Sequence, residues 1–167
     1  MKLVNKIIIN APAEKVWKVA AEDFDKVGEW LSQVNHSYKR EGESCEGSPM
    51  SGRICDLSEK ANGPIADEKI TEFNKKELRL GIHVVPKNGN IPVKENNVLA
   101  EFVVKGPNKT EVIWNSNLSL KAAGKVLYPV LKLGINKAFN ELLEELKFFV
   151  ENGTPHPRKL ATLKKAS

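Results

Sequence analysis

The sequence has 167 residues, of which 41% are hydrophobic and 28% are charged, and its formal net charge is +5. This composition is typical of a single globular domain with a sizeable core, and it excludes disordered, collagen-like and disulfide-scaffold proteins. Four of the excess positive charges lie in residues 154–167, which contain no acid, so the rest of the chain is nearly neutral and gives no strong nucleic-acid signal.

The chain begins with a pattern typical of one strand followed by two short helices. Residues 3–9 are rich in β-branched side chains, which favours a strand. Pro12 suits the first turn of a helix over residues 13–21, and Asp23 is a good cap for a second short helix. The apolar run at 7–9 is too short for a signal peptide, and no stretch approaches the roughly 20 apolar residues of a membrane span. We therefore predict a cytoplasmic protein without a membrane signal.

Six further strands follow these helices. Short turns rich in glycine, proline and asparagine separate extended segments at residues 36–41, 52–57, 66–73, 77–85, 96–105 and 110–121. Consecutive strands with short connections predict an antiparallel meander. With the first strand, the predicted sheet has seven strands.

The last predicted element is a long amphipathic helix over about residues 125–152, which Gly153 ends. Pro129 lies within its first turns, so the alternatives are a kinked start and a start nearer Tyr128. Its apolar stripe must be buried, and the meander is the only large partner. A twisted sheet curls, so it can wrap around the helix. We therefore predict an α+β domain over residues 1–153, in which a seven-stranded curved antiparallel sheet grips a long C-terminal helix, followed by a flexible basic tail at 154–167.

Five short segments carry a resemblance to a known superfamily. They are INAPAEKVW at residues 9–17, GRI at 52–54, DEKI at 67–70, IPV at 91–93 and TEVIW at 110–114. In this order they resemble the helix-grip superfamily of START domains, polyketide cyclase/dehydrase-like proteins, birch pollen allergens and plant abscisic-acid receptors. The resemblance covers roughly residues 2–152. It implies an internal cavity between sheet and helix that takes a small, mostly hydrophobic lipid, polyketide or plant-hormone-like ligand.

The resemblance also implies which residues line that cavity. Strand positions that share a face by period two are Leu80, Ile82 and Val84, and likewise Val98, Ala100 and Phe102. The helix would oppose them with Leu131, Ile135, Ala138 and Leu142. The alternative for each of these side chains is that it simply fills the core.

Three polar residues are further candidates. The resemblance places Glu68 on the inward face, where its carboxylate would need a partner or a ligand; the alternative is a solvated strand glutamate. In the last strand, polarity alone would turn the apolar set with Trp114 inward. Similarity to the receptors would instead turn Asn115 and Asn117 into the cavity, and we favour this second interpretation.

Two loops are candidates for control of entry. Residues 59–66, with Gly63, Pro64 and Ile65, resemble the gate loop of the abscisic-acid receptors. Residues 86–94, with Ile91 and Pro92, occupy the position of the latch, although they lack the receptors' histidine and arginine. Ordinary turns are the alternative.

Metal, cofactor and catalytic motifs are missing from the sequence. Cys45 and Cys55 could form a disulfide, but two free thiols are favoured, and neither they nor the scattered histidines have metal-ligand spacing. There is no nucleotide-binding glycine motif or nucleophile elbow. We therefore predict a non-enzymatic carrier or sensor that has no cofactor and is a monomer or homodimer. The alternatives are a cyclase or dehydrase with Glu68 as proton carrier, and a protein- or RNA-interaction module that uses the basic tail.

Overall fold

One curved antiparallel sheet and one long helix make up most of the molecule. The computed structural model describes residues 1–166, without the side chains of residues 123, 125, 165 and 166. The seven strands are β1 (Lys2–Ile9), β2 (His36–Lys39), β3 (Gly52–Asp56), β4 (Ile65–Asn74), β5 (Arg79–Lys87), β6 (Val93–Gly106) and β7 (Lys109–Leu120). Their order in the sheet is β1-β7-β6-β5-β4-β3-β2, and every neighbouring pair is antiparallel. The predicted meander is therefore confirmed, and β1 joins it by pairing with β7.

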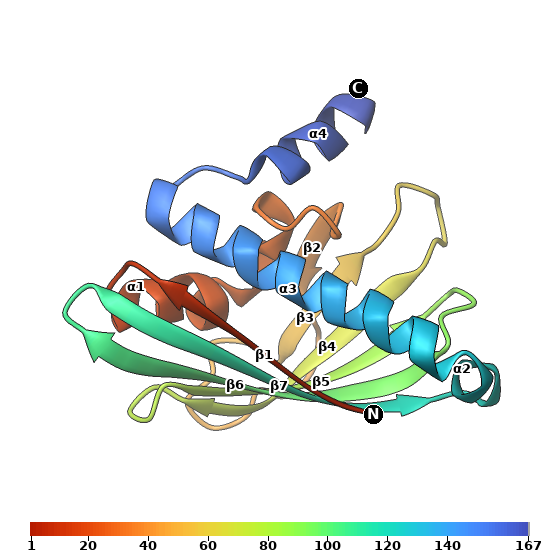
Figure 1. Ribbon diagram of the computed structural model, residues 1–167, viewed down its shortest axis with the longest axis horizontal. Coiled ribbons are helices and arrows are strands. Elements are labelled where there is room, and N and C mark those ends of the chain that lie inside the picture. The colour runs from red at the N-terminus through yellow and green to blue at the C-terminus, as the bar shows by residue number, and fades with distance from the viewer. Residues whose placement is uncertain (167) are drawn as a thin grey trace.

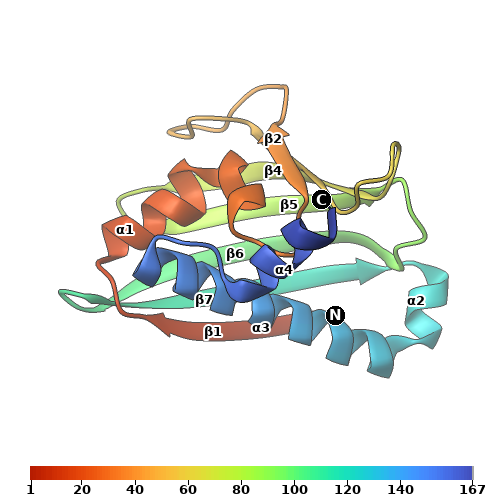
Figure 2. The same ribbon diagram turned by 90° about the horizontal axis from the view of Figure 1, so that it is seen from above.

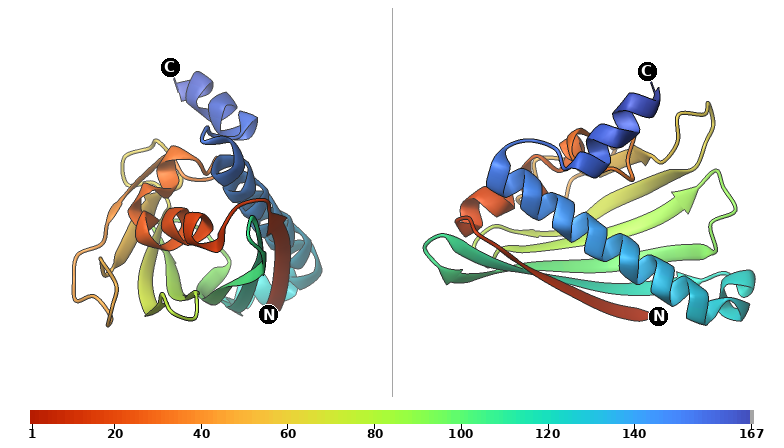
Figure 3. Two further views of the ribbon diagram at one scale, coloured as in Figure 1. Left: turned by 90° about the vertical axis from the view of Figure 1, so that its left-hand side faces the viewer. Right: turned by 45° about the horizontal axis from the view of Figure 1, so that its top comes forward.

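The helices lie on one side of this sheet (Figures 1 and 2). The chain forms α1 (Ala13–Trp17), a π-helical turn η1 (Lys18–Glu22) and a 3₁₀ segment η2 (Phe24–Glu29) after β1. The long helix α3 (Tyr128–Asn152) crosses the concave face diagonally, after a separate short helix α2 (Ala122–Val126). Figure 3 shows the sheet curling around α1 and α3, so the predicted helix-grip arrangement is confirmed.

The ends of α3 follow from its sequence. α3 begins at Tyr128, the later of the two predicted starts, and Pro129 lies in its first turn, where its missing N–H costs no hydrogen bond. Gly153 adopts a left-handed conformation (φ +72°) and its N–H donates to the Phe149 carbonyl oxygen at 2.8 Å. This is the glycine stop that the sequence predicts.

Two hydrophobic clusters hold the helices on the sheet. The larger one fills the space beneath α1 and the C-terminal half of α3, and includes Trp17, Phe24, Trp30, Ile70 and Leu146. The smaller one consists of Leu3, Val93 and Leu118 with partly buried neighbours, among them Ile135. Phe139 of α3 packs against both clusters.

The flexible tail predicted for residues 154–167 is wrong for most of its length. Pro157–Ala166 form a helix, α4, that lies over the C-terminal half of α3 and the segment before β2 (Figure 1). The side chain of Lys159 is 2% exposed, and its Nζ donates to the Val34 carbonyl oxygen at 2.6 Å. Composition alone missed this helix because Arg158 pairs with carboxylates of α3 and Lys159 with a backbone carbonyl oxygen far away in the sequence. Ser167 lies outside the described residues.

Candidate functional site

The larger hydrophobic cluster already fills one end of the predicted cavity. Five of the strand positions predicted to line it belong to this cluster and are at most 5% exposed: Leu80, Ile82, Val98, Ala100 and Phe102. Phe102 also meets the edge of Trp17, with ring centroids 5.5 Å apart. Their contact with a ligand stays a prediction, and the core-filling alternative describes their surroundings in this structure.

The remaining apolar candidates are only half-buried. They are Val84 on β5 and Leu131, Ile135, Ala138 and Leu142 on α3. Val84 and Leu142 pack on the larger cluster, and Ile135 packs on the smaller one. These five side chains are therefore more exposed than the five strand positions in the larger cluster.

Asn115 and Asn117 face the wrong way for a cavity site. The inward residues of β7 are Val112, Trp114, Ser116 and Leu118, all of them buried. Asn115 instead donates from Nδ2 to Glu101 Oε2 at 3.1 Å, and Asn117 is exposed. Pairing of β7 with β1 is regular throughout, so no bulge turns the two asparagines inward. Simple polarity therefore predicts this strand correctly.

The inward face does carry polar groups, at positions that were not predicted. Asn96 is 6% exposed and Ser116 is 3% exposed, yet Asn96 Oδ1 and Ser116 Oγ are buried without a hydrogen-bond partner among the described residues. Val98 pairs with Ser116 and Asn96 pairs with Leu118, so the two polar residues are diagonal neighbours, about 7–8 Å apart by sheet geometry. They lie between the two hydrophobic clusters, because Val98 belongs to the larger and Leu118 to the smaller.

Two further unpaired atoms adjoin them. Trp114 Nε1 and Asn5 Oδ1 are also buried without a partner, and the two residues face each other on the paired strands β7 and β1. Asn5 Nδ2 donates to Asn136 Oδ1 at 2.8 Å and to Asn140 Oδ1 at 2.7 Å on α3. Phe139 stands near the Trp114 ring, with centroids 6.4 Å apart. One donor and several acceptor positions thus face α3 from three adjacent strands.

Glu68 lies on the inward face of β4, but it already has a partner. Arg53 Nη2 is 2.7 Å from Glu68 Oε2, and Arg53 Nε donates to the same oxygen at 2.8 Å. Arg53 also donates to the Phe24 carbonyl oxygen and lies over the Phe24 ring, 3.8 Å from its centroid. Burial of the nearby Cys55 thiol, together with the Glu68 charge, raises the pKa of that thiol to about 12. The ion pair links β3, β4 and η2 and leaves Glu68 poorly placed to carry a proton.

The two predicted entry loops meet above this face. A Cβ placed on Gly89 would lie 3.1 Å from Pro64 Cβ, so the loop before β4 and the loop before β6 are in close contact there. Gly63, Pro64 and Ile65 line an open pocket of about 790 Å³ beside α4. Ile91 instead packs on the smaller cluster, and the Pro92 carbonyl oxygen accepts a hydrogen bond from Lys121 N at 2.9 Å.

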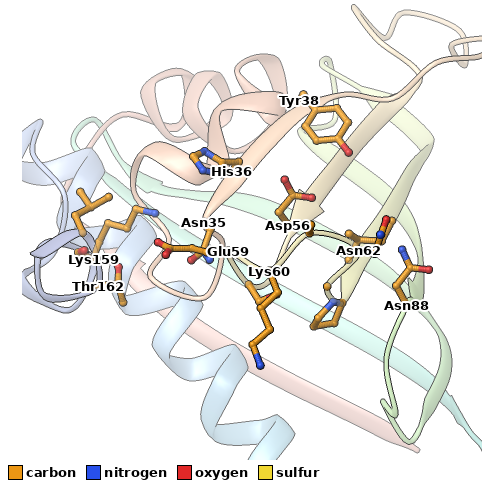
Figure 4. Close-up of a pocket in the computed structure, with 16 residues that line it drawn as sticks. Asn35, His36, Tyr38, Asp56, Glu59, Lys60, Asn62, Asn88, Lys159 and Thr162 are labelled. Carbon is orange, nitrogen blue, oxygen red and sulfur yellow. Dashed lines mark hydrogen bonds between the residues drawn. The ribbon is translucent and has the colours of Figure 1, made fainter. Parts of the chain in front are cut away.

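The pocket beside α4 has a polar lining. Figure 4 shows Lys159 and Thr162 of α4 on one side and Asn62 and Asn88 of the two loops on the other. None of the inward sheet positions described above belongs to its lining. It is therefore an outer pocket at the loops, separate from the space between the sheet and α3.

A buried carboxylate fixes α4 at the rim of this pocket. Glu145 of α3 is 0% exposed and accepts hydrogen bonds from Ser32 N at 2.6 Å and Ser32 Oγ at 2.7 Å. Arg158 of α4 lies 3.4 Å from it and also pairs with Glu144. Desolvation lowers the pKa of Lys159, while the nearby Glu145 charge opposes that shift.

Other chemistry finds little support in the described part of the chain. Cys45 and Cys55 are free thiols, as favoured from the sequence. Within residues 1–166, no group of three or more His, Cys, Asp or Glu side chains is arranged to hold a metal ion. No helix there is both long and apolar enough to cross a membrane.

The fold and this inward face define the class of protein: a START-like helix-grip domain, whose sheet and long helix enclose the candidate site. The chain belongs to the family described as polyketide cyclase/dehydrase and lipid transport, whose model matches residues 1–151. A search of curated proteins gave no match.

Solved structures with the same fold are distant in sequence. A START superfamily protein from Mycobacterium smegmatis has 14% identity and a TM-score of 0.73, and the match covers 92% of this chain and 99% of that one. DynU16, a protein in the dynemicin biosynthetic locus, has 17% identity and a TM-score of 0.63, covering 92% and 48%. The di-domain ARO/CYC StfQ of the steffimycin biosynthetic pathway has 15% identity and a TM-score of 0.67, covering 90% and 45%. At these identities the likeness establishes the fold and leaves the ligand open.

Proposed function

We propose that this protein binds a small, mostly hydrophobic molecule between the sheet and α3, as a carrier or sensor. The ligand would be a lipid or polyketide-like compound that carries hydroxyl or carbonyl groups. Its apolar part would lie against the half-buried side chains of α3 and β5, such as Leu131, Ile135 and Val84. Its polar groups would meet Asn96, Ser116 and Trp114.

The unpaired polar atoms between the two hydrophobic clusters carry this proposal. A buried polar atom without a partner costs about 1–3 kcal/mol, so a protein that only needed a core would favour apolar residues at these positions. Asn96 Oδ1 can accept a hydrogen bond, Trp114 Nε1 can donate one, and Ser116 Oγ can do either. A hydroxyl or carbonyl group on an apolar molecule would satisfy them.

The expected affinity is consistent with a carrier. Burying about 300 Å² of apolar ligand surface supplies roughly 7 kcal/mol before the entropic cost of binding. Each newly paired polar atom adds about 1 kcal/mol or more. Binding in the micromolar range, about 8 kcal/mol, is therefore attainable without special chemistry.

A cyclase or dehydrase remains the alternative for this fold, but Glu68 gives it little support. Its carboxylate is held by Arg53, and releasing it to move a proton would leave the Arg53 charge buried and unpaired. The StfQ likeness is one of fold.

A titration with two matched flavones tests the proposal. Chrysin carries two hydroxyl groups that flavone lacks, on the same ring skeleton. We expect saturable binding of chrysin, monitored by quenching of tryptophan fluorescence, and weaker binding of flavone. The double variant Asn96→Leu/Ser116→Ala should lower the affinity for chrysin about tenfold and leave that for flavone nearly unchanged. An equal loss of affinity for both ligands in the double variant would refute the proposal. It would also be refuted if neither ligand bound saturably and native mass spectrometry found no co-purified molecule.

A further inference from the structure

The exposed apolar side chains of the molecule concentrate on α2 and the start of α3. Val126 is 82% exposed, Leu127 54%, Val130 72% and Leu133 74%. Val130 and Leu133 are three residues apart in α3 and are therefore neighbours on one helix face. A Cβ added to Gly134 would meet nothing within 4 Å, so this side of the helix is open. These four residues form the α2–α3 apolar face, and no other described residue of the chain covers them.

The charged residues in the stretch of chain that carries this face all have one sign. Residues 112–140 contain no aspartate or glutamate and four lysines. Lys121 and Lys132 are exposed and form no ion pair within residues 1–166, whereas Lys137 lies 3.8 Å from Glu141 of the next turn. The partner that fits is therefore apolar where it meets the helices and negatively charged around them.

We propose that the α2–α3 apolar face docks on an anionic phospholipid bilayer. Aliphatic side chains flanked by lysines are typical of segments that lie in the membrane interface, where the chains enter the lipid and the lysines meet the headgroups. A second copy of this chain fits less well, because a symmetric contact would bring the same lysines together without acids. A nucleic acid fits less well because the exposed groups are mainly aliphatic and do not stack on bases.

The position of the face makes this docking useful. α2 and the start of α3 lie at one end of the molecule (Figures 1 and 3). Gly124 of α2 lies close to Pro92, since a Cβ on it would be 2.6 Å from the Pro92 carbonyl oxygen. Docking would therefore bring the loop before β6 to the bilayer. The proposal does not depend on the proposed function, but a carrier of apolar molecules would gain a route between membrane and protein.

Vesicle co-sedimentation of the full chain tests the docking. Vesicles with about one third phosphatidylglycerol should bind the protein at low ionic strength, and pure phosphatidylcholine vesicles should bind it at least about tenfold more weakly. The variant Val130→Asp/Leu133→Asp should lose about tenfold or more of this binding. The control Val4→Asp/Val104→Asp changes the charge equally at two exposed strand residues and should bind as the wild type does.

Several results would overturn the proposal. One is equal binding to both vesicle types, and another is unchanged binding of the Val130→Asp/Leu133→Asp variant. A second variant, Lys121→Glu/Lys132→Glu, should also lose binding, and retention would contradict the role of charge. A dimer in light scattering that the aspartate variant abolishes, without vesicle binding, would assign the face to a second copy. Binding to an RNA oligonucleotide in place of vesicles would assign it to nucleic acid.

Discussion

Ser116→Ala should stabilise the ligand-free protein, although Ser116 is buried in the middle of the fold. The Ser116 hydroxyl has been removed from water and has no partner among the described residues. Leaving such a group unpaired costs about 1–3 kcal/mol. Replacing the hydroxyl group by a hydrogen atom removes this cost and changes the side-chain volume little. We expect the free energy of unfolding to rise by about 1 kcal/mol, which corresponds to about 2–4 °C in Tm for a chain of this size.

Ser51 provides a matched control. It is also buried, at 2% exposed against 3% for Ser116, but its hydroxyl donates to the Arg40 carbonyl oxygen at 2.5 Å. Ser51→Ala removes a hydrogen bond and leaves that carbonyl without this donor, so it should destabilise the protein by about 1–2 kcal/mol. The same substitution at the same burial should therefore shift stability in opposite directions at the two sites.

The difference in stability between the two variants can be measured by urea unfolding, monitored by tryptophan fluorescence. Any co-purified molecule is removed first. The midpoints should shift in opposite directions, with an unchanged slope against urea concentration. If Ser116→Ala destabilises the protein as much as Ser51→Ala does, the Ser116 hydroxyl has a partner, such as a bound water, in the ligand-free protein. The reasoning about unpaired atoms would then be wrong.

Two further predictions concern other buried groups. Glu145→Ala should destabilise the protein by about 3 kcal/mol, because it removes the acceptor of two Ser32 hydrogen bonds and an anion beside α4. The control Glu144→Ala removes an exposed ion pair and should cost less than about 1 kcal/mol. Equal urea midpoints for the two variants would contradict this prediction. Burial raises the pKa of Cys55 to about 12, so at pH 8 a thiol reagent should label Cys45 first. Because the unfolded thiol ionises before the folded one, the free energy of unfolding should fall between about pH 9 and 12 more steeply in the wild type than in Cys55→Ala. Equal slopes for the two proteins would exclude this contribution.

The fold was predictable because its signals are local and repeated. Strand patterns, turns and the stripe of α3 each point to the same arrangement, and Gly153 marks the end of the helix through its own backbone conformation. α4 was missed for the opposite reason. Its helical pattern is short, and the burial of Lys159 depends on the Val34 carbonyl oxygen, 125 residues earlier in the chain.

The inward polar residues were within reach of the sequence but were attributed to the wrong positions. Asn96 continues the alternation of Val98, Ala100 and Phe102, and Ser116 lies between Trp114 and Leu118 on the apolar face of its strand. Period two alone places both inward. Similarity to the receptor branch drew attention to Asn115 and Asn117, whose side chains lie on the outer face. That Asn96 Oδ1 and Ser116 Oγ would lack partners could not be predicted, because it depends on what α3 presents to them.

Stability and binding should therefore be coupled through the same atoms. The unpaired groups of Asn96, Ser116 and Trp114 lower the stability of the ligand-free protein, and a ligand that pairs with them recovers this free energy as affinity. A ligand at 100 times its Kd stabilises the folded state by about 2.7 kcal/mol. The gain in Tm on adding chrysin should then be larger for the wild type than for Asn96→Leu/Ser116→Ala, while the variant should be the more stable protein without ligand. A variant that is both less stable and weaker in binding would indicate a damaged fold, and it would refute the coupling.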